Sequence, residues 1–466
     1  MAFQDMWYRN LYPDIKSAGV DPSTHFYTFG LAENRIYDPI SYLNEDFLAK
    51  RLVVTLYTLY LIIDRYSNYI FLKRFLVKLI SYLQYLKIRS FSIDLVVVKS
   101  WLEGGVKEAC QIYEEEIYKK YSIFELNGLQ NAFNNSESPM IYKYKHLNKY
   151  VKESLLFFPI STLEFFSTQK RIKYVHIHHC FGIEFNFNLM LKFKKEVKLY
   201  YFLHDYYIFS SLPHLYIEKL QRRLSLEEAI DLYPNRLLEI EAILSRINLF
   251  ISQSLNMKYN IQTLFPINTI LTLYPPETSN IENIPVKNIE VKETYNVLIL
   301  GNLGNYKGES VLRDLLEESE KQNLSFKFFH IGSSNSKILS KNYTNFIGVE
   351  RSSIYALVSR LEIDFAWLPF QCEESYSFTL SDIFLLGLPL ISNSIGAIPE
   401  RCYKRENTIL VKESVNEVTN VLSYFHLLTS SYSIKNEHYP PQFGQNETQS
   451  IYALRSRNKH DYSVLH

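Results

Sequence analysis

Two acidic residues, Glu374 and Asp382, stand eight positions apart in the stretch FQCEESYSFTLSDIFLLG. The pattern places Glu374 in a polar loop after a strand, and Asp382 in the first turns of the helix that follows. The N–H groups of such a loop and the dipole of the helix favour an anion. Because a carboxylate on each side can accept hydrogen bonds from hydroxyl groups, the layout fits a diphosphate flanked by a sugar and a ribose.

Each carboxylate also has a structural interpretation. Asp382 lies three residues after Thr379 and could complete a capping box. Glu374 could be a solvated loop charge. For either residue alone the structural interpretation is favoured, but the pair together with Lys307 favours a ligand site.

A second loop, GNLGNYKG, places Gly301, Gly304, Lys307 and Gly308 between a strand pattern and a helix pattern. Glycine lets the backbone approach a ligand closely, and a helix N-terminus favours an anion. A phosphate is therefore the expected ligand, although Lys307 could equally be a surface lysine beside a turn. The loop is neither Gly-x-Gly-x-x-Gly nor a Walker loop, which makes a nicotinamide-dependent dehydrogenase a distant candidate.

The elements that must position these loops form an α/β rhythm, which starts near residue 91 and restarts near residue 295. Strands alternating with helices predict two doubly wound parallel sheets, whose ligands bind beyond the carboxyl ends of the strands. A stretch rich in Pro, Asn and charge, 274–293, predicts a linker. The expected division is a small helical repeat-like module, a helical linker, an acceptor-side domain, a donor domain and a tail: 1–50, 51–90, 91–285, 286–430 and 431–466.

Composition narrows the class of protein. The chain has 466 residues, 47% of them hydrophobic, and a net charge of +1, which argues against broad nucleic-acid binding. Its four cysteines form no Cys-x-x-Cys pair, as is typical of a reducing compartment. The first residues do not read as a signal peptide, and the longest apolar run, 52–63, is shorter than the ~20 residues of a membrane span. We expect a cytoplasmic protein.

A helical pattern over 52–90 interleaves basic and apolar residues, and its basic members are Lys73, Arg74, Lys78, Lys87 and Arg89. Such a helix can associate peripherally with the anionic inner surface of a membrane. It can also be a packed linker whose basic face is solvated, and this second interpretation is favoured.

The C-terminal half resembles the donor domain of the GT-B glycosyltransferases, most closely glycosyltransferase family 4. That family carries Glu-x7-Glu where this chain has Glu374 and Asp382, and a Gly-Arg-x4-Lys-Gly loop where it has Lys307. The stretch LGLPLISNSIGAIPER also matches, with Gly387, Pro389, Gly396 and Glu400 in place. Asn302 replaces the usual arginine and removes one positive charge from the donor site.

The resemblance implies roles for particular residues. Glu374, Lys307 and His204 would be catalytic, with Lys307 on the diphosphate, Glu374 on the sugar hydroxyls and Asp382 on the ribose. His204, in YYFLHDYYIFS, matches a strand-end histidine of the acceptor domain and would contact the donor sugar. Further substrate-binding residues would be Gly104, Gly105, Asp205, Gly301, Asn302, Ser375, Tyr376, Ser377, Phe378 and Thr379.

A cluster of histidines in KYVHIHHC also invites a metal interpretation. Strand alternation would place His176, His178 and Cys180 on one face. A structural zinc site needs four ligands, and no fourth is evident nearby in the sequence. We therefore expect cleft-facing imidazoles, no metal and no cofactor.

The first 45 residues resemble a short repeat of bacterial surface-polysaccharide proteins. The matching segments are Tyr12-Pro13-Asp14-Ile15, Asp21-Pro22, His25-Phe26, Gly30 and Glu33-Asn34-Arg35. This match carries no information about chemistry.

The resemblance as a whole implies transfer of a sugar from a nucleotide-diphosphate sugar to a polysaccharide or a lipid-linked glycan. Configuration would be retained, and the leaving phosphate would act as the base. The alternative is a catalytically inactive GT-B protein that binds a glycan or a partner protein. The replacement by Asn302 and the extra N-terminal module motivate this alternative.

Overall fold

A computed structural model gives the structure of the chain. It describes residues 15, 21–25, 55–57, 59–60, 70–88, 93–99, 109–110, 113, 118, 121–127, 140–146, 149–156, 172–178, 193–232, 243–265, 267, 269–275, 284–403, 405–411 and 418–430. The chain divides into two compact units. The first unit comprises Met1–His204 and Asn235–Ile251, and the second comprises Asp205–Pro234 and Ser252–His466. These ranges run differently from the expected ones, since 205–234 and the residues from 252 onward group with the C-terminal half.

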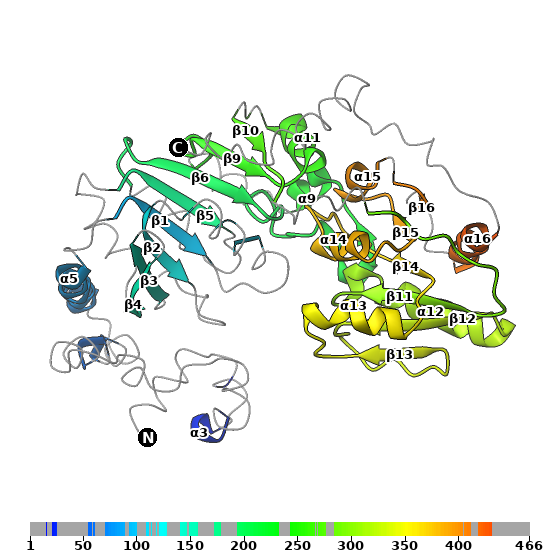
Figure 1. Cartoon of the computed structure of the whole chain (residues 1–466). Helices are drawn as coiled ribbons and strands as arrows, with labels where there is room; N and C mark the ends of the chain where they lie inside the picture. Colours follow the sequence, from blue (N-terminus) through cyan, green and yellow to red (C-terminus); the bar gives the residue numbers. More distant parts are fainter. Residues whose placement is uncertain are drawn as a thin grey trace. The chain divides into compact units, whose positions relative to one another are not determined.

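The first sheet has eight strands in the order β10-β9-β6-β5-β1-β2-β3-β4 (Figure 1). The central strand β1 runs parallel to β2 and β5, and β5 runs parallel to β6. An antiparallel extension, β2-β3-β4, was not foreseen from the sequence. The strands are β1 Leu95–Lys99, β2 Ser122–Asn127, β3 Met140–His146, β4 Lys149–Leu156, β5 Tyr174–His178, β6 Lys198–Leu203, β9 Leu249–Ser252 and β10 Ile270–Thr272.

The second sheet has six strands in the order β13-β12-β11-β14-β15-β16, and all its neighbouring strands run parallel. The chain builds outward from β11 to β13 and then returns to continue beside β11 with β14. The gap between β11 and β14 is therefore the switch point, where ligands bind in doubly wound sheets. The strands are β11 Tyr295–Leu300, β12 Phe326–Ile331, β13 Tyr343–Phe346, β14 Phe365–Leu368, β15 Leu390–Asn393 and β16 Thr408–Val411.

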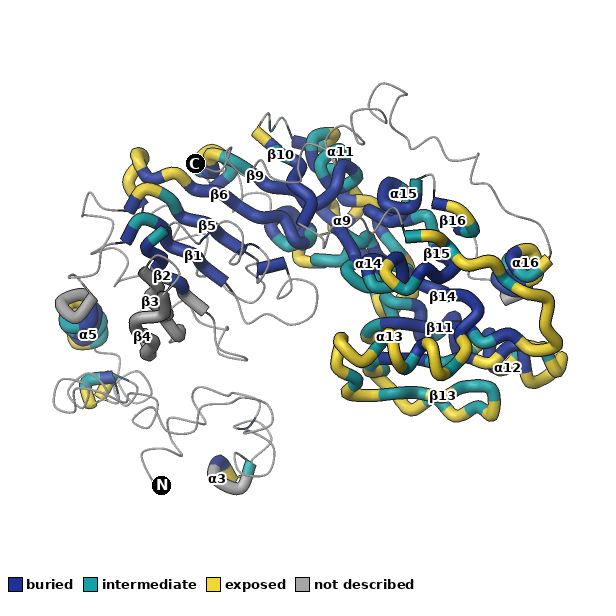
Figure 2. Tube along the Cα trace, viewed as in Figure 1, coloured by how far each residue is buried: buried dark blue, intermediate teal, exposed yellow. Residues whose placement is uncertain are grey.

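Both faces of the second sheet are buried, because alternate residues of one strand enter different cores. Val297 and Ile299 pack in a cluster with α12 and α16, whereas Leu298 and Leu300 pack with α13 and α14. Figure 2 shows β11 and β14 as buried strands between these more exposed helices. The helices are α12 Glu309–Gln322, α13 Arg351–Arg360, α14 Phe378–Leu385 and α16 Val418–Thr429. The short 3-10 helix η5 Asn305–Lys307 lies in the loop between β11 and α12.

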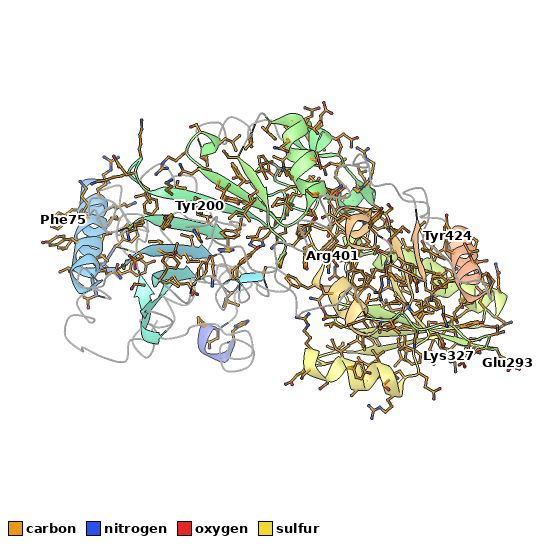
Figure 3. The ribbon with its side chains drawn as sticks, turned by 45° about the horizontal axis from the view of Figure 1, so that its top comes forward. Phe75, Tyr200, Glu293, Lys327, Arg401 and Tyr424 are labelled. Carbon is orange, nitrogen blue, oxygen red and sulfur yellow. The ribbon has the colours of Figure 1, made fainter. Side chains whose placement is uncertain are left out.

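The remaining described helices lie outside these two clusters, except α15 (Ile398–Arg401), whose Ile398 packs in the cluster with α13 and α14. They are α3 Pro22–His25, α5 Ile70–Ile88, α9 Leu226–Leu232, α11 Leu255–Leu264, α15 Ile398–Arg401 and the 3-10 helix η3 Glu218–Leu220, which joins the two-stranded ladder β7 Tyr216–Ile217 and β8 Arg222–Arg223. Helix α5 falls within the expected helical stretch and leaves Leu72, Phe75 and Tyr82 exposed, with Phe75 projecting from the helix (Figure 3). Within the described parts of the chain, no helix combines the length and apolarity needed to cross a membrane.

Candidate functional site

The two loops singled out in the sequence meet at the switch point of the second sheet. A Cβ atom on Gly301 would lie 3.1 Å from Thr379 Oγ1, at the start of α14. At Gly308 the approach is closer, since a Cβ would lie 2.1 Å from the carbonyl oxygen of Pro369, and φ is +86°. Only glycine fits such a position. The loop after β11 is therefore held directly against the loop after β14.

Lys307 and Glu374 contact each other at this junction. The Nζ atom of Lys307 donates a hydrogen bond to Glu374 Oε1, and their side chains are 21% and 13% exposed. The ammonium also lies 4.3 Å from the centre of the Phe370 ring. Burial alone would lower the pKa of Lys307, but the adjacent Glu374, with smaller help from Cys372, leaves that pKa raised. Lys307 is thus a fixed positive charge, not a surface lysine beside a turn.

Asp382 has a different partner from the one that a capping box would give it. Its Oδ1 atom accepts hydrogen bonds from Arg351 Nε at 2.8 Å and Nη2 at 2.6 Å. The N-cap of α14 is Ser377, whose side chain accepts from Leu380 N. The capping-box interpretation of Thr379 and Asp382 is therefore wrong. Sequence analysis did not identify Arg351, which lies 31 positions earlier, as a partner of Asp382.

Arg401 shapes the backbone between the two carboxylates, and the sequence did not indicate this role. Its Nη1 donates to the carbonyl oxygens of Tyr376 at 3.0 Å and Ser377 at 2.6 Å, and its Nη2 donates to Ser381 Oγ. The guanidinium also lies 4.0 Å from the centre of the Tyr376 ring. Arg401 is only 4% exposed and lies within the second unit (Figure 3). It holds Ser377 in the left-handed conformation, φ 72°, which is uncommon for a residue other than glycine.

The loop after β11 is fixed from its other side by β12. His330 Nε2 lies 2.8 Å from the carbonyl oxygen of Gly301, and Tyr343 OH lies 2.7 Å from His330 Nδ1. Because a carbonyl can only accept, Nε2 carries the proton and Tyr343 donates to Nδ1. Burial lowers the pKa of His330, in keeping with a neutral ring. The side-chain oxygen of Asn302 accepts a hydrogen bond from the hydroxyl of Ser333 at 2.8 Å.

His204 lies at the carboxyl edge of the first sheet, in the first unit, and is buried. Its Nε2 lies 3.1 Å from His178 Nδ1, and His178 Nε2 lies 2.8 Å from Tyr118 OH, which is also 3.2 Å from His176 Nδ1. Burial, and then the neighbouring His204, lower the pKa of His178 well below the usual range. A neutral His178 must accept on one nitrogen and donate on the other. The tautomer of His204 is therefore coupled to the proton of Tyr118.

The histidines of β5 share one face, as alternation predicted, but Cys180 lies outside the described residues. The cysteine near them is Cys110. Its sulfur, a nitrogen of His178 and a nitrogen of His204 all lie within 4.8 Å of one another, and all three residues are buried. Burial raises the pKa of Cys110 to about 12, so the sulfur is protonated. Three such donors could hold a metal with one further ligand; the expectation of no metal stays a prediction.

The other expected site residues are more scattered. Gly104 and Gly105 lie outside the described residues. Asp205 belongs to the second unit and accepts the backbone N–H of Tyr207 at 2.8 Å, so it stabilises a turn. Ser375, in the loop after β14, and Phe378, the first residue of α14, are partly exposed.

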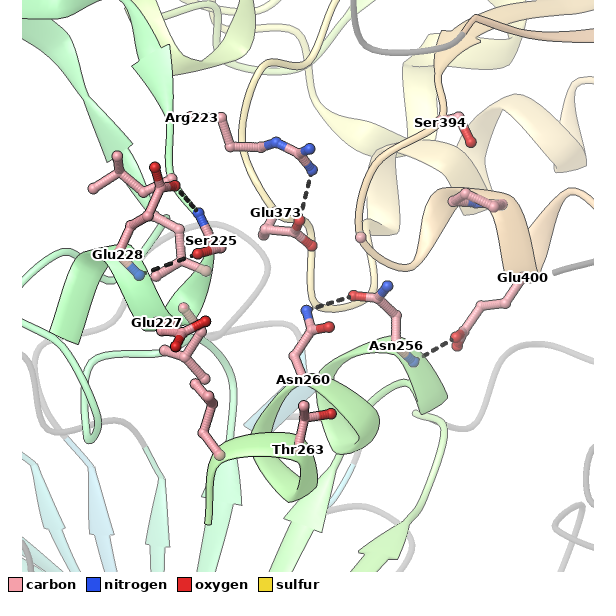
Figure 4. A pocket seen from close by; sticks show the side chains of 16 residues that line it. Arg223, Ser225, Glu227, Glu228, Asn256, Asn260, Thr263, Glu373, Ser394 and Glu400 are labelled. Carbon is pink, nitrogen blue, oxygen red and sulfur yellow. Dashed lines mark hydrogen bonds and ion pairs between the residues drawn. The ribbon is translucent and has the colours of Figure 1, made fainter. Parts of the chain in front are cut away.

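A pocket of about 540 Å³ opens beside the same loop, and all its lining residues belong to the second unit (Figure 4). Arg223 Nη1 donates to Glu373 Oε1 at 2.7 Å on one wall. Burial raises the pKa of Glu373, and Arg223 partly opposes that rise. On another wall, Glu400 accepts the N–H groups of Leu255 and Asn256, which begin α11. The sequence predicted neither Arg223 nor Glu373 as a functional residue.

Comparisons with known proteins bear on the fold. No protein-family model matches the chain, and no curated protein matches it in sequence. Among solved structures, sucrose-phosphate synthase from Thermosynechococcus elongatus is 11% identical, with a TM-score of 0.53 over 80% of this chain and 98% of that one. Anabaena HepE with UDP-glucose is 12% identical, with a TM-score of 0.48 over 79% of this chain and 93% of HepE. The catalytic domain of Arabidopsis thaliana starch synthase IV is 10% identical, with a TM-score of 0.47 over 79% and 99%.

These neighbours are glycosyltransferases. The likeness to sucrose-phosphate synthase, together with the two sheets, shows the fold: this chain has the GT-B architecture of two Rossmann-like α/β domains. The predicted fold class is confirmed. Membership of glycosyltransferase family 4 and the N-terminal repeat stay predictions.

Proposed function

We propose that this protein transfers a sugar from a nucleotide-diphosphate sugar to a polysaccharide or lipid-linked glycan, with retention of configuration. The observation that carries the proposal is the contact between Lys307 and Glu374 at the switch point of the second sheet. A lone lysine or a lone carboxylate would be ordinary there. At the ligand-binding edge of the sheet, the Lys307 cation suits a diphosphate, and the adjacent Glu374 carboxylate suits the hydroxyl groups of a sugar joined to it.

Lys307 would neutralise the charge that develops on the leaving diphosphate, which stabilises the transition state electrostatically. The N-terminus of α14, formed by Ser377 and the residues after it, would add backbone N–H groups to the same anion. When the phosphate arrives, Lys307 turns from Glu374 toward it, and Glu374 becomes available to the hydroxyls of the sugar. Its partnership with Glu374 keeps Lys307 protonated until then.

Asp382 would hold the ribose while its Oδ1 stays bonded to Arg351, since a carboxylate has acceptor sites on two oxygens. His204 would orient the donor sugar, with its tautomer set through His178 and Tyr118. No protein nucleophile is needed in this scheme, because the leaving phosphate takes the proton of the acceptor hydroxyl.

A thermal-shift screen of UDP-, ADP-, GDP- and dTDP-sugars tests the proposal. A ligand that binds only the folded protein raises the melting temperature. We expect one donor to stabilise wild-type protein and to stabilise Lys307→Met far less. Absence of stabilisation by every donor, and of donor hydrolysis or transfer, would reject the proposal.

A second candidate is a protein of the same fold that binds glycans or a partner without catalysis. Asn302 favours it, since this residue adds no positive charge and its oxygen is already bonded to Ser333. Calorimetry separates the two candidates. Nucleotide binding supports the enzyme, and glycan binding without nucleotide binding supports the second candidate.

A further inference from the structure

The pocket of about 540 Å³ in the second unit contains polar atoms that the Lys307 site does not use (Figure 4). Its size falls within the ~300–1,000 Å³ typical of small-molecule sites. Neither Lys307 nor Glu374 lines it. Its lining includes Arg223, Asn256, Asn260, Glu373 and Ser394. We call it the Glu373 pocket.

Within the part of the chain that the structure describes, two polar atoms on its wall are buried without a hydrogen-bond partner, namely Glu373 Oε2 and Ser394 Oγ. The Glu373 side chain is only 10% exposed, and its other oxygen is fixed by Arg223. A Cβ atom on Gly396 would lie 3.2 Å from Glu373 Oε2, so a side chain there would crowd this oxygen. Buried polar groups in folded proteins are nearly always hydrogen-bonded, so both atoms point to a ligand that supplies the missing bonds.

Four acidic side chains line the pocket, Glu227, Glu228, Glu373 and Glu400. Three of them already have partners, since Glu228 pairs with Arg222, Glu373 with Arg223 and Glu400 with N–H groups of α11, and this favours a neutral ligand that donates hydrogen bonds. Arg223 already balances the charge of Glu373, so a ligand needs no positive charge of its own to bind there. Glu400 is likewise committed to the start of α11 and to the hydroxyl of Tyr274 at 3.2 Å. The amides of Asn256 and Asn260 face the same space and bond each other at 3.2 Å. Carboxylate, hydroxyl and amide groups together suit a polyol.

We propose that the Glu373 pocket binds a neutral saccharide through hydroxyl groups that donate to Glu373 and Ser394. Glu373 and Glu374 are consecutive and reach different partners, Arg223 and Lys307. A saccharide in this pocket therefore lies beside a sugar held by Glu374. If the protein has the proposed transferase function, the saccharide in this pocket is the acceptor glycan. Only this identification of the saccharide rests on the proposed function.

The test measures binding of sugars to the full chain without nucleotide, by saturation-transfer NMR and calorimetry at millimolar concentrations. The probes are glucose, galactose, N-acetylglucosamine, maltose, cellobiose and lactose, with glucosamine as a cationic comparison. We expect at least one neutral sugar to bind. Ser394→Ala should weaken binding of that sugar about threefold to tenfold, because it removes a neutral hydrogen bond. Glu373→Gln should weaken binding about tenfold to a hundredfold, because it removes a hydrogen bond to a charged group.

Matched variants control for the substitutions themselves. Ser352→Ala and Glu317→Gln change exposed residues of α13 and α12 and should leave binding unchanged. Should Glu373→Gln fail to fold, Ser394→Ala decides, because the Ser394 hydroxyl makes no hydrogen bond to any described residue and its removal should not disturb the fold. Binding by no neutral sugar, binding indifferent to both pocket variants, or a preference for glucosamine over glucose would overturn the proposal.

The two sites fail separately in this design. Lys307→Met should weaken nucleoside diphosphate binding about tenfold to a hundredfold and leave saccharide binding unchanged. If wild-type protein binds no nucleotide but binds a sugar that Ser394→Ala weakens, the proposed transferase function is rejected and the saccharide pocket stands.

Discussion

Replacing Lys307 separates what the Lys307–Glu374 pair does for stability from what it does for ligands. In Lys307→Met, the carboxylate of Glu374 keeps only the thiol of Cys372, at 3.6 Å, among its described side-chain contacts. Removing one partner of a buried pair costs about 3–5 kcal/mol, and this pair is partly open to solvent, so we expect about 2 kcal/mol. For a unit of this size that corresponds to a fall of roughly 4–8 °C in melting temperature.

The double variant Lys307→Met/Glu374→Gln should regain most of that loss, because no buried charge remains unpaired. Lys321→Met is the matched control. Lys321 bonds Glu317 on the surface of α12, and both side chains are more than half exposed, so the same substitution should cost at most about 1 kcal/mol.

Ligand binding should distinguish Lys307→Met from Glu374→Gln, because the two variants are expected to affect different parts of a nucleotide sugar. A charged hydrogen bond to phosphate is worth about 1.5–3 kcal/mol, so Lys307→Met should weaken the preferred nucleoside diphosphate about tenfold to a hundredfold. Glu374→Gln should leave the diphosphate alone as tight or tighter, because it releases the lysine, and should weaken the complete nucleotide sugar. Calorimetry with UDP, ADP, GDP and their sugars measures both effects. Equal loss of diphosphate and nucleotide sugar in Glu374→Gln, or wild-type diphosphate binding in Lys307→Met, would refute the reasoning.

Three further expectations concern the loops and the linker helix. Gly308→Ala should lower the free energy of unfolding by well over the about 1–2 kcal/mol that a left-handed residue costs, because the new Cβ would meet the Pro369 carbonyl. Gly348 has φ 72° and open space around it, so Gly348→Ala should cost only about 1–2 kcal/mol. Denaturant unfolding of both variants measures the difference. Burial lowers the pKa of His330 in the folded protein, so its contribution to stability should be fully present above about pH 6.5. Below that pH the free energy of unfolding should fall by up to about 1.4 kcal/mol per pH unit, because the unfolded chain takes up the proton first. Thermal melts of His330→Gln from pH 7 to 5 should lack this pH-dependent loss of stability. Flotation with anionic vesicles tests the basic helix. The packed-linker interpretation predicts that the amount of protein that floats with the vesicles is unchanged when the five basic residues of the helix become glutamine, namely Lys73, Arg74, Lys78, Lys87 and Arg89. A smaller amount of floating protein in this variant would contradict the interpretation.

The sequence determined the local elements of the second sheet well. The strand expected before Glu374 is β14, Phe365–Leu368, and the helix expected to hold Asp382 in its first turns is α14, Phe378–Leu385. Apolar periodicity and glycine or proline boundaries are short-range signals, so one sequence carries them. The same signals placed Lys307 and Glu374 at carboxyl ends of strands, where a parallel sheet brings loops together.

Only the tertiary structure decided which loops meet and which partner each charge has. Strand β14 lies beside β11 and not beside its predecessor β13, and this crossing puts Glu374 against Lys307. Arg223 reaches Glu373 across 150 positions of sequence. Such pairings depend on how separate elements pack, because the burial of apolar faces selects neighbours that local patterns do not encode.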